Sequence, residues 1–123
     1  MGRILLFAAA ALLVATAVIH ALGQPMVDGW VQHLEDRQKA AICLVWMTDS
    51  VSWAVVAAIW GMAGWKQERG WLGASALGMI VPLSMVVGIM GIDPTFFGGW
   101  MLVGSIVLAM AGLALIWRRP VNG

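Results

Sequence analysis

The residue most out of place in this sequence is Asp49, an acid inside a long apolar run. The run covers residues 40–65 and holds no other charged side chain. A carboxylate in the middle of such a segment costs about 3 kcal/mol on membrane-insertion scales. Asp49 must therefore face the interior of a bundle, pair with another group or stay protonated.

Three tryptophans recur every seven residues around this acid. Trp46 lies three residues before Asp49, Trp53 lies four residues after it, and Trp60 follows seven residues later. All three are predicted to contribute to a ligand-binding wall. Residues three and four apart share one face of a helix, so Asp49 is predicted to lie between two indoles. An acid flanked by aromatic faces can bind a cation, stabilise a developing carbocation or hold a planar ligand. A tryptophan stripe at this spacing also fits a packed helical core in which Asp49 bonds a neighbouring helix.

His20 is the second candidate for acid–base chemistry. It lies three residues before Gly23, at the end of an apolar run, which places it about 5 Å below the membrane surface. Counted in the same way from Lys39, Asp49 lies about 15 Å deep, near the bilayer midplane. A direct contact between the two is not expected, although a water molecule or a substrate could bridge them. His20 could relay protons or ligate a haem or metal, but no second ligand stands at a paired spacing, so no metal site is predicted.

Further polar groups are predicted at the depth of Asp49. Pro82 removes an intrahelical hydrogen bond and crowds the carbonyl four residues earlier, which would free backbone oxygens beside Asp49. The alternative is a kink that helps the helices pack. Three hydroxyl groups are predicted in the same layer: those of Ser84, Thr16 and Ser105. Ser84 is also predicted to bind the ligand.

The helices that must hold these residues are predicted to be membrane spans. Of the 123 residues, 62% are hydrophobic and only 11% are charged, whereas soluble domains carry about 25% charged residues. A helix needs about 20 apolar residues to cross a hydrocarbon core of ~30 Å, and barrel strands are much shorter. The runs that meet or approach this length are 4–23, 40–65, 71–92 and 100–117. We therefore predict an all-α polytopic membrane protein, a single four-helix transmembrane bundle with up-down topology.

The first run, 4–23, also resembles a secretory signal peptide, with small residues at its end. It is longer than a usual signal core, and Pro25 closely follows the candidate cleavage site at Gly23. We therefore expect it to remain as a span.

The positive charges predict the orientation. On one side lie Arg3, Lys66, Arg69, Arg118 and Arg119. On the other side lie Arg37 and Lys39, diluted by Asp28, Glu35, Asp36 and Asp93. Because cytoplasmic loops carry the excess of Lys and Arg, both termini are predicted to face the cytoplasm of a bacterium, with the acidic side in the periplasm.

The connections between spans are short. A tight hairpin is predicted at 66–70, and Asp93-Pro94-Thr95 is predicted to form a turn or a helix cap. The longest loop, 24–39, is predicted to carry a short surface helix through 31–37. Five tryptophans at span ends or in loops are explained as interfacial rings: Trp30, Trp65, Trp71, Trp100 and Trp117.

Several function classes are disfavoured by composition. A formal net charge of +1 argues against a nucleic-acid partner, and a single cysteine, Cys43, argues against a disulfide framework or disulfide exchange. Small residues four apart, such as Ser105 and Ala109, indicate closely packed helices and are compatible with a homo-oligomer. The expected partners are the lipid bilayer, a hydrophobic small molecule and other membrane chains.

Three functions remain open. The first is a membrane-embedded site for a lipid-like small molecule, as in an isomerase or a hydratase, with Asp49 as general acid or base, Trp46 and Trp53 as walls and His20 as proton relay. The second is a non-catalytic accessory or assembly subunit of a larger membrane complex, in which Asp49 docks a partner helix. The third is a proton-coupled transporter with Asp49 as the coupling acid, ranked last because four spans are few for a transport path.

Overall fold

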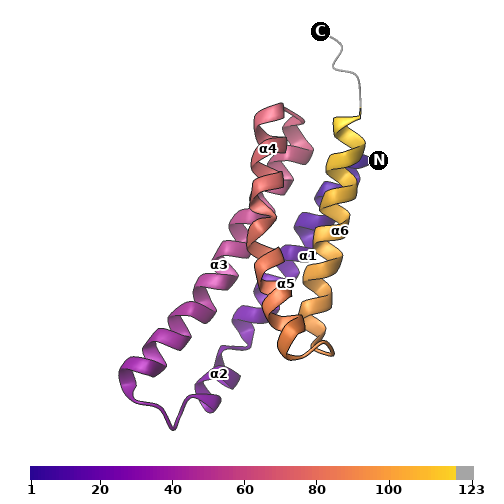
Figure 1. Ribbon diagram of the computed structural model, residues 1–123. Coiled ribbons are helices and arrows are strands. Elements are labelled where there is room, and N and C mark those ends of the chain that lie inside the picture. The colour runs from indigo at the N-terminus through magenta and orange to yellow at the C-terminus, as the bar shows by residue number, and fades with distance from the viewer. Residues whose placement is uncertain (119–123) are drawn as a thin grey trace.

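The described part of the chain forms six helices, and four helical stretches within it are long and apolar enough to cross a membrane. A computed structural model describes residues 1–118. The helices are α1 (Gly2–Leu22), α2 (Gln24–Trp30), α3 (Asp36–Lys66), α4 (Arg69–Gly78), α5 (Ile80–Ile92) and α6 (Phe97–Trp117). The spans are α1, α3, α6 and the α4–α5 pair, and the start of α1 lies at the same end as the end of α6 (Figure 1). The predicted helical membrane bundle is confirmed; Arg119, used for the orientation, lies outside the described residues.

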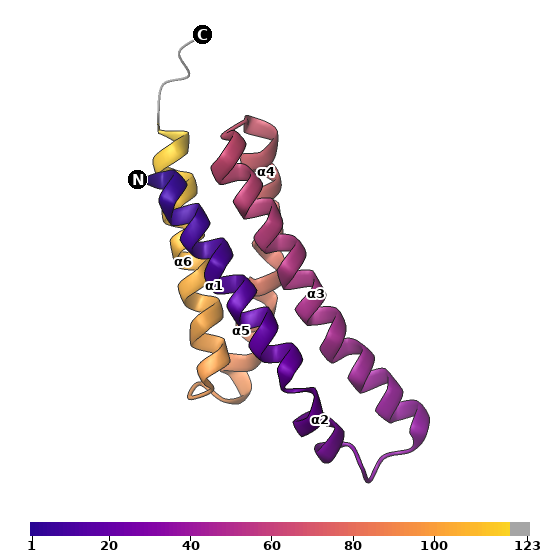
Figure 2. The ribbon, with the colours of Figure 1, turned by 180° about the vertical axis from the view of Figure 1, so that it is seen from behind.

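Helix α1 forms the centre of the bundle, where it packs against both α3 and α6 (Figure 2). Leu6, Ala9 and Leu13 recur at helical spacing on one face of α1 and are fully buried. They join one apolar cluster with Trp60 of α3 and Leu102 of α6. The run that resembles a signal peptide is thus a structural part of the core.

The two ends of the chain pack closely because glycines line the helix crossing. A Cβ atom at Gly112 of α6 would lie 3.0 Å from the carbonyl oxygen of Gly2 and 3.1 Å from the backbone nitrogen of Leu6. On the other side of α1, a Cβ atom at Gly64 of α3 would lie 3.3 Å from the Cβ of Leu6. Small residues let membrane helices approach in this way, so α1 is held tightly between α3 and α6.

The third span is broken at Met79, between α4 and α5. Pro82 has no N–H to donate to the carbonyl of Gly78 four residues earlier, so the predicted loss of a helical hydrogen bond falls at this break. The N–H of Met79 donates to Ala76 at 3.3 Å instead of to Ser75. The proline therefore ends one helix and starts another within a single span.

The Ser75 carbonyl, which the Met79 N–H leaves free at this break, accepts a hydrogen bond in the core. The indole Nε1 of Trp60 donates to the Ser75 carbonyl at 3.2 Å. Gly78 packs against Val56, which lies about two helical turns from Asp49. The expected alignment of the Pro82 break with Asp49 is therefore wrong, because the two helices are offset along their length.

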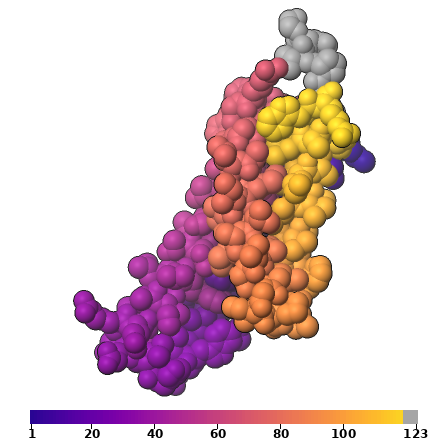
Figure 3. Space-filling model, viewed as in Figure 1, coloured from indigo at the N-terminus to yellow at the C-terminus, as the bar shows by residue number. Residues whose placement is uncertain are grey.

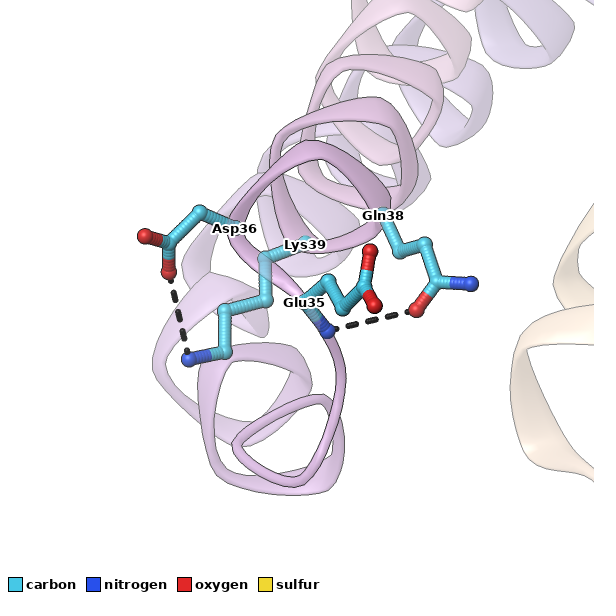
Figure 4. A network of polar contacts seen from close by, with 4 residues as sticks. All are labelled: Glu35, Asp36, Gln38 and Lys39. Carbon is cyan, nitrogen blue, oxygen red and sulfur yellow. Dashed lines mark hydrogen bonds and ion pairs between the residues drawn. The ribbon is translucent and has the colours of Figure 1, made fainter.

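The short surface helix lies earlier than predicted. It is α2, Gln24–Trp30, with Pro25 in its first turn, where the ring's fixed φ and missing N–H cost nothing. The predicted segment 31–37 instead holds a turn and the start of α3. Glu35 caps α3 through a reciprocal capping box, in which its backbone N–H donates to Gln38 Oε1 at 3.2 Å (Figure 4).

The connection before α6 is a turn closed by Asp93. Its Oδ1 accepts a hydrogen bond from the Thr95 hydroxyl at 2.6 Å and from the Thr95 N–H at 2.9 Å. These two bonds, the side-chain bond first, hold the pKa of the exposed Asp93 carboxyl below its ordinary value. Helix α6 begins only at Phe97, so of the two predicted roles Asp93 takes that of a turn residue.

Helix α3 is much longer than the membrane core is thick. Its 31 residues correspond to about 46 Å, against a hydrocarbon core of ~30 Å. Together with α2 it projects past the turn between α5 and α6, as Figures 1 and 3 show. Val27 and Val31 are buried where α2 meets α3. We call residues 24–45 the outer arm.

Candidate functional site

A cavity of about 220 Å³ lies at the end of the bundle where the outer arm begins. Its walls come from α1, α2, α3, α5, α6 and the turn before α6. The lining residues are Thr16, Ile19, His20, Trp30, Trp46, Asp49, Trp53, Met85, Ile89, Phe96, Gly98 and Met101. Those on α1 and α5 fall in the last two turns of these helices, and those on α6 in its first two turns. The cavity therefore belongs to one end of the bundle.

The His20 ring is fixed by three side chains of α3. It stacks on the Trp46 indole with centroids 3.7 Å apart and planes 15° apart, and it meets Trp53 edge-on at 4.7 Å. Its Nδ1 shares a hydrogen bond of 2.9 Å with the Ser50 hydroxyl. Since Nδ1 is occupied in this way, Nε2 is the ring nitrogen left for another partner.

His20 therefore lies beside the turn of α3 that carries Asp49. The expectation that Asp49 lies about 10 Å deeper than His20 is wrong, because Ser50 directly follows Asp49 and contacts the His20 ring. The depth of Asp49 counted from Lys39 is too great because Lys39 lies in the outer arm, into which α3 continues. Lys39 and Gly23 do not mark the same membrane surface.

Trp46 is held over the end of α1 by a hydrogen bond as well as by stacking. Its indole Nε1 donates to the His20 carbonyl at 2.8 Å. A Cβ atom at Gly23 would lie only 3.1 Å from Cζ2 of this indole. The glycine leaves room for the ring, and the ring forms a preorganised wall.

Asp49 is half-buried and faces two hollows. It lines the cavity and also a groove on the outer side of α3, formed with Ala41, Ile42, Val45 and Trp46. Among residues 1–118, no hydrogen bond or ion pair to its carboxyl is found, and no Lys or Arg lines the cavity. This carboxyl is therefore available to an occupant of either hollow.

Trp53 contributes a second polar group without a partner. Its side chain is only 1% exposed, and its indole Nε1 has no acceptor within the part of the chain that the structure describes. Buried donors are nearly always satisfied, so this unpaired nitrogen, enclosed in a residue that also lines the cavity, is an exception within the site.

The cavity brings together four of the six predicted site residues: Asp49, His20, Trp46 and Trp53. Trp60 does not line it and is fully buried in the core. The exposed Ser84 hydroxyl does not line it either and donates to the Val81 carbonyl at 2.8 Å.

The other predicted hydroxyls differ from one another. Thr16 lines the cavity, while its Oγ1 donates to the Leu12 carbonyl at 2.8 Å. Ser105 is buried away from the cavity, and its hydroxyl donates to the Met101 carbonyl at 2.9 Å. Thr16 alone of the predicted layer therefore lies with Asp49.

Several residues of the site were not predicted. Ser50 lies four residues after Trp46 and three before Trp53, so helical spacing could have identified it as a member of the same face. Trp30 was explained as an interfacial ring, yet it also lines the cavity. No sequence signal distinguishes Phe96 or Met101 from other apolar residues, because their places follow from how the helices meet.

The polar atoms of this site suit proton transfer better than metal binding. In residues 1–118 no three His, Cys, Asp or Glu side chains lie close enough to hold a metal ion. The cavity instead combines one carboxyl, one imidazole nitrogen and several aromatic faces. Such a set can move a proton and stabilise positive charge on the group that receives it. Comparison of this chain with protein-family models, curated proteins and solved structures gives no match.

Proposed function

We propose that this protein binds a lipid-like small molecule in the cavity and that Asp49 and His20 act on it as acid and base. The observation that carries the proposal is the arrangement of these two groups. A carboxyl without an intramolecular partner and an imidazole held by Ser50 meet in one cavity with aromatic walls. An isomerase or a hydratase can use an acid and a base placed in this way.

The proton balance of an isomerisation fits the two groups. Protonated Asp49 gives its proton to one carbon of a substrate double bond, and the neighbouring carbon becomes positively charged. Neutral His20 then takes a proton from the next carbon, and the electron pair of that C–H bond forms the shifted double bond. In a hydration, water adds to the cationic carbon and loses its proton to His20. The Trp46 and Trp53 rings stabilise the positive charge in both cases.

The proposed location is a bacterial inner membrane with both termini in the cytoplasm, as the excess of Lys and Arg favours. The cavity then opens in the periplasmic leaflet, and Cys43 lies on the same side. Its thiol donates to Asp28 Oδ1 at 3.3 Å and is partly accessible.

A membrane-impermeant maleimide is therefore expected to label Cys43 in intact cells, with no labelling of Cys43→Ser. Gln32→Cys in the Cys43→Ser background places a thiol at an exposed position of the outer arm and serves as a more reactive reporter. Labelling that requires cell lysis would reverse the proposed orientation.

The small-molecule proposal predicts that filling the cavity removes the bound molecule. Met101→Trp enlarges a lining side chain, whereas Met110→Trp enlarges a side chain that is 57% exposed on the outer face of the same helix. Protein purified in mild detergent would be examined by absorption spectroscopy, and its extract by mass spectrometry. We expect one class of hydrophobic molecule in the wild type and in Met110→Trp, and at least about tenfold less in Met101→Trp, since overpacking of this size costs 1–3 kcal/mol.

Equal amounts of the molecule in both tryptophan variants would place its binding elsewhere. A wild type that carries no molecule would favour the second candidate, an accessory subunit of a membrane complex. That candidate is supported by the groove on the outer side of Asp49, whose apolar floor is formed by Ala41, Ile42 and Val45. A partner helix seated there would co-purify with the wild type and be lost from Asp49→Ala.

A further inference from the structure

We infer that the cavity selects positive charge and that the molecules it takes are ammonium amphiphiles. The inference rests on the proposed function and narrows the ligand class. In an acid-catalysed reaction the same position would hold the cationic carbon once Asp49 has given up its proton, so a bound ammonium group mimics the cationic intermediate.

The first argument is the charge of the cavity. Asp49 is the one carboxyl among the lining residues, and no Lys or Arg lies beside it there. The Lys39 side chain on the same helix is paired with Asp36, at 3.8 Å. An ionised carboxyl at membrane depth is costly unless it is paired, so a cation brought by the occupant would be stabilised by it.

The second argument is the aromatic wall. Trp30, Trp46, Trp53 and Phe96 all line the cavity that Asp49 faces. The negative faces of such rings attract cations, tryptophan most strongly, and several rings around one cation are the usual site for a quaternary ammonium group. Trp46 is also held in place by its bond to the His20 carbonyl, so this part of the wall needs no reorganisation on binding.

The third argument is size and position. A cavity of about 220 Å³ exceeds the ~150 Å³ that accommodates a benzene molecule, and it is too small for a whole lipid. The lining residues lie in the last turns of α1 and α5 and the first turns of α6. The cavity therefore lies toward one end of the bundle, and an alkyl chain attached to the ammonium group would extend between the helices into the bilayer.

The test measures binding of tritiated dodecyltrimethylammonium to the purified full-length protein in uncharged maltoside micelles. We expect saturable binding to the wild type and at least about tenfold weaker binding to Asp49→Asn. Asp49→Glu, which keeps the charge, and Asp36→Asn, which removes a fully exposed carboxylate, should stay within about threefold of the wild type. Trp46→Leu should weaken binding about fivefold or more, as expected for the loss of one cation–π contact.

Two competitors distinguish the contribution of the positive charge to binding from that of the alkyl chain. The neutral isostere 2,2-dimethyltetradecane, in which carbon replaces nitrogen, should compete at least about tenfold more weakly. Tetramethylammonium, which lacks the chain, should compete at least about a hundredfold more weakly because each buried methylene adds to binding. Equal competition by tetramethylammonium would overturn the requirement for an alkyl chain and identify a soluble amine as the ligand.

Equal competition by the neutral isostere, or unchanged binding to Asp49→Asn, would overturn the selection of positive charge. If the isostere binds and is lost in Met101→Trp, the proposed small-molecule site stands and only its charge preference fails. If neither compound binds and the wild type carries no extracted molecule, both the inference and the proposed function fail.

Discussion

Asp49→Asn is expected to lower turnover by orders of magnitude while leaving the bundle intact. Asparagine has nearly the same shape, and no described residue bonds the Asp49 carboxyl, so no internal contact is lost. Removing a group that is costly in lipid should leave the melting temperature equal to that of the wild type or higher. Loss of the general acid should lower the rate by about 10²–10⁴-fold.

The rate can be measured without knowing the product. The molecule extracted from the wild type would be incubated with each variant in D₂O, and uptake of deuterium at carbon would be followed by mass spectrometry. Protonation of a double bond by Asp49 and removal of a proton by His20 both exchange hydrogen with the solvent. Asp36→Asn is the matched control, because its carboxylate is exposed on the same helix. Full exchange by Asp49→Asn would exclude Asp49 as the acid.

The second large effect is expected at His20, which has a structural and a chemical role. His20→Ala removes a ring that stacks on Trp46, meets Trp53 edge-on and bonds Ser50. The loss of this packing and of one hydrogen bond should lower the free energy of unfolding by about 2–4 kcal/mol. Thermal unfolding in one detergent would show this, with Val18→Ala as a control because Val18 is 52% exposed on α1.

His20→Phe separates the two roles. The phenyl ring keeps the stack between Trp46 and Trp53 but has no nitrogen to accept a proton, and it leaves the Ser50 hydroxyl without its partner. We expect this variant to regain most of the stability that His20→Ala loses and to show no deuterium exchange above background. The base hypothesis would be falsified if His20→Phe exchanged at the wild-type rate.

The sequence predicts the fold well because the membrane imposes strict lengths. Apolar runs of about 20 residues have few alternatives to a helix in lipid, so the predicted bounds lie within a few residues of α1, of the α4–α5 pair and of α6. The ends of α3 were harder to predict. Its first turn is made of polar residues stabilised by the Glu35–Gln38 capping box, and polar residues carry no hydropathy signal for a span.

The polar first turn of α3 also explains why the site was only partly predicted. Helical spacing alone grouped Asp49 with Trp46 and Trp53, and the structure places these three in one cavity. The contacts of Trp46, Trp53 and Ser50 with His20 depend on how far α3 is shifted along α1. The spacing of residues within one helix does not indicate such a shift between two helices. Pro25 is typical of a first helical turn and is the residue of the loop that indicates α2.

The length of α3 makes this protein sensitive to hydrophobic mismatch. A helix of about 46 Å can be matched to a bilayer by tilting or by leaving its end outside, and each ångström of mismatch costs a fraction of a kcal/mol. Trp30 of the outer arm and Asp49 of α3 belong to the same cavity wall. A thicker bilayer draws more of the arm into lipid, and a thinner one leaves more of it in water. The thickness of the surrounding membrane therefore determines whether the cavity lies beside acyl chains or beside lipid head groups.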